Sequence, residues 1–406
     1  MSSHLENESY DTKVSAELAR YEAQEEVHDL PPIYHYWSER YCLPLLAEVG
    51  FAGLEDFFDE HVAEQCEIRA PERARLVSLG AGNGDTEIGI LDRLRHRGID
   101  NLELVLLELN PQMLARATAD AERRGISDRV VSATVDLNDW RADADTDVYF
   151  ANHSLHHVVA LEDLFTEVKR SLTADGVFLV NDMIGRNGHV RWPEAGDLVR
   201  WIWSVAPERY RWNPFQASVD EVYPDHDCST SGFEGIRAQD ILPLLLDRFH
   251  PDVFITFLNV ADPFIDRIYG PNFDVSNPDD LAFVDAVGRL DDAAIDLQLV
   301  TPTHLIASFR SRPTACRYPR RRSPQRTLRT PTDEPDGVQP GHDAGPLDAG
   351  EALGLREPEA AIAQLRREHD EAWGRYNHLR RRKAVRLALA LAAARHWRPR
   401  GDGGRG

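Results

Sequence analysis

Short apolar segments alternate with amphipathic segments between residues 71 and 182, and this alternation predicts the main fold of the chain. Several apolar segments are nearly continuous, as is typical of strands that are buried on both faces of a sheet. The amphipathic segments have helical spacing, and alternation of this kind predicts a doubly wound α/β sheet with right-handed crossovers. The expected strands are residues 76–79, 104–107, 130–135, 148–151 and 177–180, and the expected helices are residues 86–97, 111–124 and 161–172.

The same sheet is expected to continue beyond this region. Residues 253–258 and 304–309 again have strand patterning. The sheet domain is therefore expected to cover residues 71–310, with insertions at 183–250 and 259–301.

The two ends of the chain differ from this domain in composition. Residues 1–70 have helical patterning with a break at Pro31 and Pro32, which predicts a helical N-terminal cap. Proline, arginine, glycine and aspartate dominate residues 311–357, which predicts a disordered linker. Helical spacing returns at residues 358–399, where a basic C-terminal helix is expected.

Charge is distributed unevenly along the 406 residues. The formal net charge is −22, yet residues 311–406 carry 20 basic and 12 acidic side chains. An acidic body repels nucleic-acid phosphates, so we expect no nucleic-acid partner. The basic tail fits three roles that the sequence does not separate: peripheral membrane contact, a short coiled coil, or a solvated helix. A homo-oligomer is also compatible with the sequence.

Cysteine usage and hydropathy favour a cytoplasmic location. The four cysteines are widely spaced and form no CxxC pair, so neither a disulfide scaffold nor a cysteine zinc site is expected. No apolar run reaches the ~18 residues that a membrane span needs. The first residues are polar and acidic, unlike a secretory signal.

A glycine-rich loop after the first expected strand is the most informative motif. It contains Gly80, Ala81, Gly82 and Gly84, and glycines there permit a tight turn and close approach of the backbone to a ligand. A dinucleotide fingerprint would have its third glycine at position 85, where this chain has Asp85, a poor neighbour for a pyrophosphate. The GxGxG spacing with acids nearby instead favours S-adenosylmethionine, which carries a positive sulfonium and no phosphate.

Two carboxylates end the next two expected strands. Glu108, followed by Leu109, is placed to accept hydrogen bonds from both ribose hydroxyls. Asp136 is placed to accept from the adenine amino group, with Leu137 against the ring. Ligands bind at the carboxyl ends of such strands, so the loop and both acids are expected to share one pocket. A helix cap or a solvated side chain is the alternative for each acid.

These motifs resemble those of the class I S-adenosylmethionine-dependent methyltransferases, over roughly residues 71–310. The resemblance implies a seven-stranded Rossmann-like sheet in which only the last strand is antiparallel, with the two insertions on the substrate side. The resemblance also includes the segment 147–157 of the fourth strand. It is closest to a bacterial subgroup often associated with glycan or cell-surface biosynthesis, through residues 27–37, 182–189, 191–194 and 232–240.

One position departs from the family pattern. The family usually has an acid two residues before the first glycine, where it organises the loop and interacts with the methionine end of the cofactor. This chain has Ser78 there, which accepts fewer hydrogen bonds. Asp85 or a residue of the N-terminal cap is expected to take over.

The resemblance implies methyl transfer to a small-molecule or glycan-linked acceptor, expected at oxygen. Such a displacement needs near-attack geometry, and a hydroxyl must also lose its proton. Asp182 and His189 are the better candidates for the base, although a structural network with nearby arginines is the alternative for both. The catalytic candidates at the tips of the fourth and fifth strands are Asp182, His156, His157 and His189, and Asn152 is expected to contact the cofactor.

The histidines of this region have other interpretations. For His156 and His157, a role in organising the loop or contacting the cofactor is favoured over catalysis. His153 and His157 have the i,i+4 spacing of metal ligands, but no third ligand is evident, so no metal is expected.

Two aromatic groups each have two interpretations. The segment 34–37 with Tyr41 either folds over the cofactor or packs against the domain. The tryptophans of the first insertion either stack on a sugar acceptor or form the core of a helical subdomain; they are Trp192, Trp201, Trp203 and Trp212.

Two other functions compete with methyl transfer. A nicotinamide-dependent oxidoreductase is disfavoured by the glycine spacing. A non-catalytic scaffold that keeps the fold is favoured by Ser78 in place of the usual acid.

Overall fold

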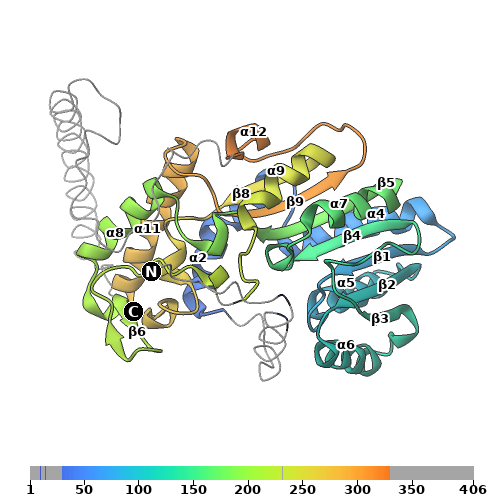
Figure 1. Cartoon of the computed structure of the whole chain (residues 1–406), viewed down its shortest axis with the longest axis horizontal. Helices are drawn as coiled ribbons and strands as arrows, with labels where there is room; N and C mark the ends of the chain where they lie inside the picture. The colour runs from blue at the N-terminus through green and yellow to red at the C-terminus, as the bar shows by residue number, and fades with distance from the viewer. Residues whose placement is uncertain (1–9, 11–13, 15–29, 231, 330–406) are drawn as a thin grey trace, which may run out of the picture. The chain divides into compact units, whose positions relative to one another are not determined.

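The computed structural model describes residues 10, 14, 30–230 and 232–329, and a seven-stranded sheet lies at their centre (Figure 1). Its strand order is β3-β2-β1-β4-β5-β9-β8. The pairs among β1 to β5 are parallel, whereas β9 is antiparallel to both of its neighbours. The predicted fold, with only its last strand antiparallel, is confirmed. The strands are β1 (Ala74–Leu79), β2 (Leu102–Glu108), β3 (Val130–Thr134), β4 (Thr146–Asn152), β5 (Leu172–Met183), β8 (His250–Phe257) and β9 (His304–Arg310).

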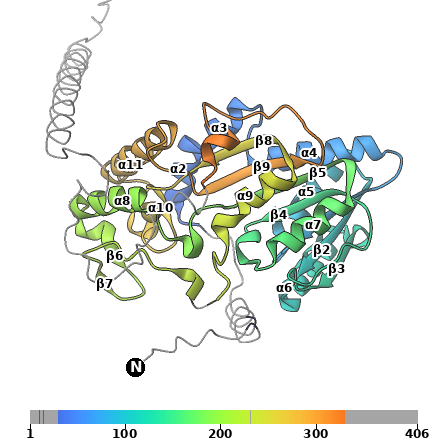
Figure 2. The same ribbon diagram turned by 45° about the horizontal axis from the view of Figure 1, so that its top comes forward.

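Successive residues of the central strands enter two separate apolar cores. Leu76 and Phe150 pack with helices on one face, whereas their neighbours Val77 and Tyr149 pack with helices on the other. Both faces are therefore buried, which explains why these strands have continuous rather than alternating apolar sequences. Figures 1 and 2 show α7 and α9 together on one face. The first core includes α4 (Leu54–Arg69), α5 (Asp85–His96) and α6 (Pro111–Arg124), and the second includes α7 (Leu161–Ser171) and α9 (Ala238–Arg248).

Helix α6 shows how local signals set these boundaries. The Asn110 side chain caps its N-terminus by accepting a hydrogen bond from the Gln112 amide, and Pro111 occupies the first turn. Gly125 ends the helix in a left-handed conformation. These caps explain why the predicted and observed bounds coincide.

The two insertions and the N-terminal segment build a helical subdomain. Trp203 is buried in its core against Phe264 and Tyr269, whereas Trp201 and Trp212 are exposed. No helix in the described part of the chain is long and apolar enough to cross a membrane. The elements are α2 (Pro32–Tyr41), α3 (Leu43–Glu48), α8 (Pro193–Val205), α10 (Asp262–Ile265), α11 (Pro278–Asp296), and the short strands β6 (Trp212–Asn213) and β7 (Ser218–Val219).

Short 3-10 turns and one short helix complete the described residues. They are η1 (Ser127–Arg129), η2 (Leu155–His157), η3 (Asn187–His189), η4 (Glu208–Arg211), η5 (Cys228–Thr230), η6 (Gly270–Asn272) and α12 (Pro324–Thr327).

The segment 311–329 is ordered, so the linker predicted from residue 311 is wrong over this part. Arg317 runs beside β8: its amide donates to the Asp252 carbonyl, and its carbonyl accepts from the Phe254 amide. Arg322 is buried and forms ion pairs with acidic residues of α11. The segment is ordered because its arginines find partners in other parts of the fold. Composition alone does not show such partners. The rest of the predicted linker and the helix at 358–399 lie outside the described residues.

Candidate functional site

The glycine loop leaves β1 and turns sharply in left-handed backbone conformations. Gly80, Gly82 and Gly84 have φ angles of +75°, +56° and +69°. A Cβ atom on Gly80 would lie 2.7 Å from the Ser154 Cβ, so only glycine fits. Gly84 instead precedes α5 as its N-cap residue, and a Cβ atom on it would lie 3.2 Å from the Ala117 Cβ. Of the residues predicted to contact a cofactor in this loop, Gly80, Ala81 and Gly82 line a pocket and Gly84 does not.

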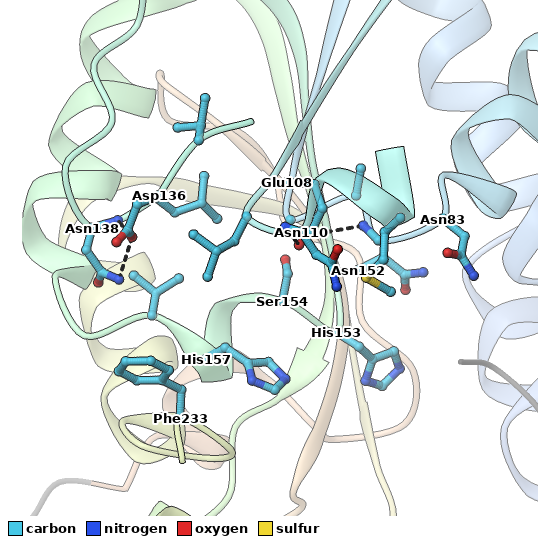
Figure 3. A pocket seen from close by; sticks show the side chains of 18 of the residues that line it. Asn83, Glu108, Asn110, Asp136, Asn138, Asn152, His153, Ser154, His157 and Phe233 are labelled. Carbon is cyan, nitrogen blue, oxygen red and sulfur yellow. Dashed lines mark hydrogen bonds between the residues drawn. The ribbon is translucent and has the colours of Figure 1, made fainter. Parts of the chain in front are cut away.

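This glycine-loop pocket lies at the carboxyl ends of β1, β2 and β4 (Figure 3). It encloses about 1050 Å³ between protein atoms, its open mouth included, which suits a cofactor-sized molecule. All of the predicted cofactor contacts except Gly84 are in its wall. The predicted residues that line it are Gly80, Ala81, Gly82, Glu108, Leu109, Asp136, Leu137, Asn152, His153 and His157.

Both strand-end carboxylates are held by short hydrogen bonds. Glu108 accepts from the Gly82 amide and from the Asn110 amide, each over 2.9 Å. Asp136 accepts from the amide and side chain of Asn138, each over 2.9 Å, and from the Tyr10 hydroxyl over 2.5 Å. The backbone therefore fixes both acids in the wall of the same pocket, as the sequence predicted.

A buried carboxyl that sequence reasoning missed completes the loop. Glu87, in the first turn of α5, accepts a hydrogen bond from the Ser78 hydroxyl over 2.5 Å and lines the pocket. Burial raises the pKa of Glu87 to about 7, although the Ser78 hydrogen bond opposes this. A carboxyl therefore lies beside Ser78 in the pocket lining, whereas Asp85, one of the residues expected to replace the missing acid, is exposed.

Aromatic residues do cover part of the pocket, but not the predicted ones. Tyr10 and Phe233 both line it, with ring centroids 5.3 Å apart. Trp37 and Tyr41 of α2 are buried in the core and pack on each other. This segment therefore packs against the domain and does not fold over the pocket. Tyr10 and Phe233 had no sequence signal because they lie far from the loop along the chain.

Asp182 is buried at the end of β5 and does not line the pocket. Burial would raise its pKa, but the adjacent imidazole and backbone donors lower it to about 2. A buried carboxylate of such low basicity, whose oxygens already accept four hydrogen bonds, fits a positioning role better than the role of base that the sequence favours. Its oxygens accept hydrogen bonds over 2.5–3.0 Å from His156 Nδ1 and from the amides of Ser154, Leu155 and Met183.

Behind the pocket, three predicted histidines surround Glu234, which the sequence did not reveal. Its carboxylate lies 3.3 Å from His156 Nε2, 2.9 Å from His189 Nε2 and 3.8 Å from His157 Nε2. Burial would lower the pKa of His156, but Asp182 and Glu234 outweigh it and raise the pKa to about 10. Burial would raise the pKa of Glu234, but the histidines hold it far below its usual value. Of this group, His157 lines the glycine-loop pocket.

Comparisons with known proteins place the central region in a family. Residues 77–180 match the family model described as a methyltransferase domain. No curated protein matches the chain. Similar solved structures include a geranyl diphosphate C-methyltransferase from Streptomyces coelicolor A3(2), solved with Mg²⁺, geranyl diphosphate and S-adenosyl-L-homocysteine (14% identity over 74% of this chain and 99% of that chain, TM-score 0.37).

Two further solved structures have similar scores. One is the O-methyltransferase of a trans-AT PKS multienzyme from Brevibacillus brevis, with S-adenosyl-L-homocysteine (10% identity, 71% and 85% coverage, TM-score 0.35). The other is a geranyl diphosphate methyltransferase with GPP and sinefungin (14% identity, 62% and 78% coverage, TM-score 0.34). These likenesses are too distant to carry an argument about the acceptor. By their family-model match, residues 77–180 form a methyltransferase domain.

Proposed function

We propose that the protein is a methyltransferase that transfers the methyl group of S-adenosylmethionine to a small-molecule or glycan-linked acceptor, at oxygen. One observation carries this proposal. The glycine-loop pocket brings the Gly82 amide, Glu108 and Asp136 together beside His157, and this set matches the parts of an adenosyl sulfonium with a nucleophile nearby.

We assign the cofactor to this pocket residue by residue. Asp136 and Leu137 hold the adenine, with Tyr10 and Phe233 as apolar walls, and Glu108 holds the ribose hydroxyls. Glu87, at the glycine end, faces the methionine ammonium, because a carboxyl is the natural partner of a cation there. Asn152, which accepts a hydrogen bond from Asn181, contributes a polar edge.

We assign the proton transfer to His157. It lines the pocket, and its Nε2 lies 3.8 Å from a Glu234 oxygen, which stabilises an imidazolium once it has formed. In the proposed step an acceptor hydroxyl gives its proton to His157, the oxygen attacks the methyl carbon, and the carbon–sulfur bond breaks to release S-adenosylhomocysteine. His153 lies in the same wall and helps to position the acceptor.

Glu87 also bears on the competing functions. Ser78 was the feature that favoured a scaffold without activity, and the Glu87 carboxyl in the same pocket wall removes that argument. We also propose a cytoplasmic location, supported by four cysteines that are all free thiols.

Calorimetry with the full chain tests the cofactor assignment. We expect wild-type protein to bind S-adenosylmethionine and its demethylated product, and Asp136→Ala to weaken both at least tenfold. Binding of neither ligand would refute the proposal in favour of the scaffold, and binding of NADH instead would favour the oxidoreductase. A methyl donor with an isotopic label, incubated with cell extract, then identifies the acceptor.

A further inference from the structure

A cluster of two histidines and one carboxylate lies behind the glycine-loop pocket. We propose that His156, His189 and Glu234 bind a divalent transition-metal ion, of the kind represented by Zn²⁺ and Co²⁺. Among the described residues, these three bring a ring nitrogen of each histidine and a carboxylate oxygen within 4.8 Å of one another.

The distances suit ligands that share one ion. The Nε2 atoms of His156 and His189 lie 3.3 and 2.9 Å from the same Glu234 oxygen. Ligand atoms about 2.0–2.2 Å from a tetrahedral zinc ion lie roughly 3.3–3.6 Å from each other. Only small side-chain shifts are therefore needed to admit an ion between them.

A second carboxylate already orients one of the ligands. Asp182 accepts a hydrogen bond from His156 Nδ1 over 2.5 Å and is itself held by three backbone amides. A metal-binding histidine typically donates its other ring N–H to such a carboxylate, which fixes the tautomer and aims the free nitrogen at the metal. Asp182 thus gives His156 the support that a metal ligand requires.

The other histidine can change its tautomer to suit an ion. His189 Nδ1 is buried and has no hydrogen-bond partner among the described residues. It can carry the ring proton and leave the lone pair of Nε2 to a metal.

The backbone is bent to bring these side chains together. His189 has a φ of +59°, and Gly235, next to Glu234, has a φ of +66°. A Cβ atom on Gly235 would lie 3.0 Å from the His189 ring, so glycine is required for this approach. Left-handed backbone at a residue other than glycine is unfavourable and concentrates at functional sites.

His157 connects the cluster to the glycine-loop pocket. Side-chain exposure rises from 4% at His156 to 13% at His189 and 23% at Glu234. His157, which lines the pocket, approaches the other Glu234 oxygen. Three protein ligands leave a position for water or an acceptor oxygen, as in catalytic sites, and imidazole with carboxylate suits Zn²⁺ or Co²⁺. Only this role toward the acceptor rests on the proposed function; metal binding does not.

Titration of the metal-free full chain with Co²⁺, followed by visible absorption, tests the site directly. We expect one ion per chain, displaced by Zn²⁺, with a spectrum that lacks thiolate charge transfer. His189→Gln and Glu234→Gln are expected to lower the affinity at least tenfold. The control His250→Gln, at an exposed position, is expected to leave the affinity unchanged.

Several outcomes would overturn the site. The first is that wild-type protein does not bind Co²⁺, and the second is a spectrum of the thiolate type. The third is that both folded variants bind Co²⁺ as tightly as wild type, which would indicate an adventitious ion only. The wild-type stoichiometry and spectrum decide the question even if a variant fails to fold. Binding of S-adenosylmethionine is measured separately on metal-free protein, so failure of the metal site and failure of the cofactor assignment give different results.

Discussion

Ser78 donates a short hydrogen bond of 2.5 Å to Glu87, and Glu87 lines the glycine-loop pocket. The strand contributes the hydroxyl and the first turn of α5 contributes the acid. A buried carboxyl whose pKa is raised to about 7 gains most from a ligand that brings its own positive charge. This pair is therefore where the chain departs from its family in sequence while keeping an acid at the pocket.

We predict that Glu87→Gln weakens binding of S-adenosylmethionine by roughly tenfold, since a hydrogen bond to a charged partner contributes about 1.5–3 kcal/mol. Calorimetry with the full chain measures this loss. Asp85→Asn, an exposed acid two residues earlier, is the matched control and is expected to have little effect. Equal affinities for Glu87→Gln and wild type would remove Glu87 from the cofactor site.

The same residue is predicted to make stability depend on pH. The pKa of Glu87 is about 7 in the folded protein and near 4.5 when unfolded, so folded protein binds the proton more tightly. Its contribution to the free energy of unfolding is thus highest below pH 4.5, falls as pH rises to about 7, and then stays constant. The total loss is on the order of 3 kcal/mol. Urea unfolding measures the free energy of unfolding at pH 5 and at pH 8. We expect this free energy to decrease less between the two pH values for Glu87→Gln than for wild type. Equal decreases in the two proteins would contradict the raised pKa of Glu87.

We predict that Gly82→Val abolishes measurable cofactor binding, because its side chain would project into the pocket beside the Glu108 hydrogen bond. Gly98→Val controls for backbone strain. Gly98 also has a positive φ, but nothing lies within 4 Å of its added Cβ. If both variants lose stability alike and both still bind the cofactor, the loop is not the binding element.

Asp182→Asn is predicted to lower the free energy of unfolding by about 3 kcal/mol, because it leaves His156 without one of its buried charge partners. Cofactor affinity is expected to change less than threefold, since Asp182 lies outside the pocket wall. Asp143→Asn, which breaks an exposed ion pair with Arg75, is the comparison and is expected to cost less than about 1 kcal/mol. Chemical denaturation compares the three proteins, and an Asp182→Asn protein as stable as the Asp143→Asn protein would argue against the positioning role.

The parts of the fold that depend on local sequence were predictable. Continuous apolar strands, the caps of α6 and the glycine loop each have signals within a few residues, and Glu108 and Asp136 follow from their places at strand ends. The doubly wound sheet then brings those acids together, because its topology sets which strand ends meet.

The remaining site residues depend on contacts between distant segments. Glu87 has the sequence signature of an ordinary acid that stabilises a helix N-terminus, and only its burial shows another role. Tyr10 and Glu234 reach the site from the N-terminal segment and the first insertion, whose packing no spacing predicts. The arginines of 311–329 had the composition of a linker, yet Asp292 and Asp296 hold Arg322 in place.

The path of Arg317 beside β8 determines where the chain can be shortened. β8 is the outermost strand on its side of the sheet, and Arg317 occupies hydrogen-bonding groups that would otherwise be open to another molecule. An uncovered edge is a template for aggregation. We expect a protein that ends at residue 329 to remain monodisperse in light scattering, and one that ends at 310 to form large particles at the same concentration. If the protein that ends at residue 310 is also monodisperse, the segment 311–329 is not needed to protect this edge. If it forms large particles, the segment prevents self-association through β8.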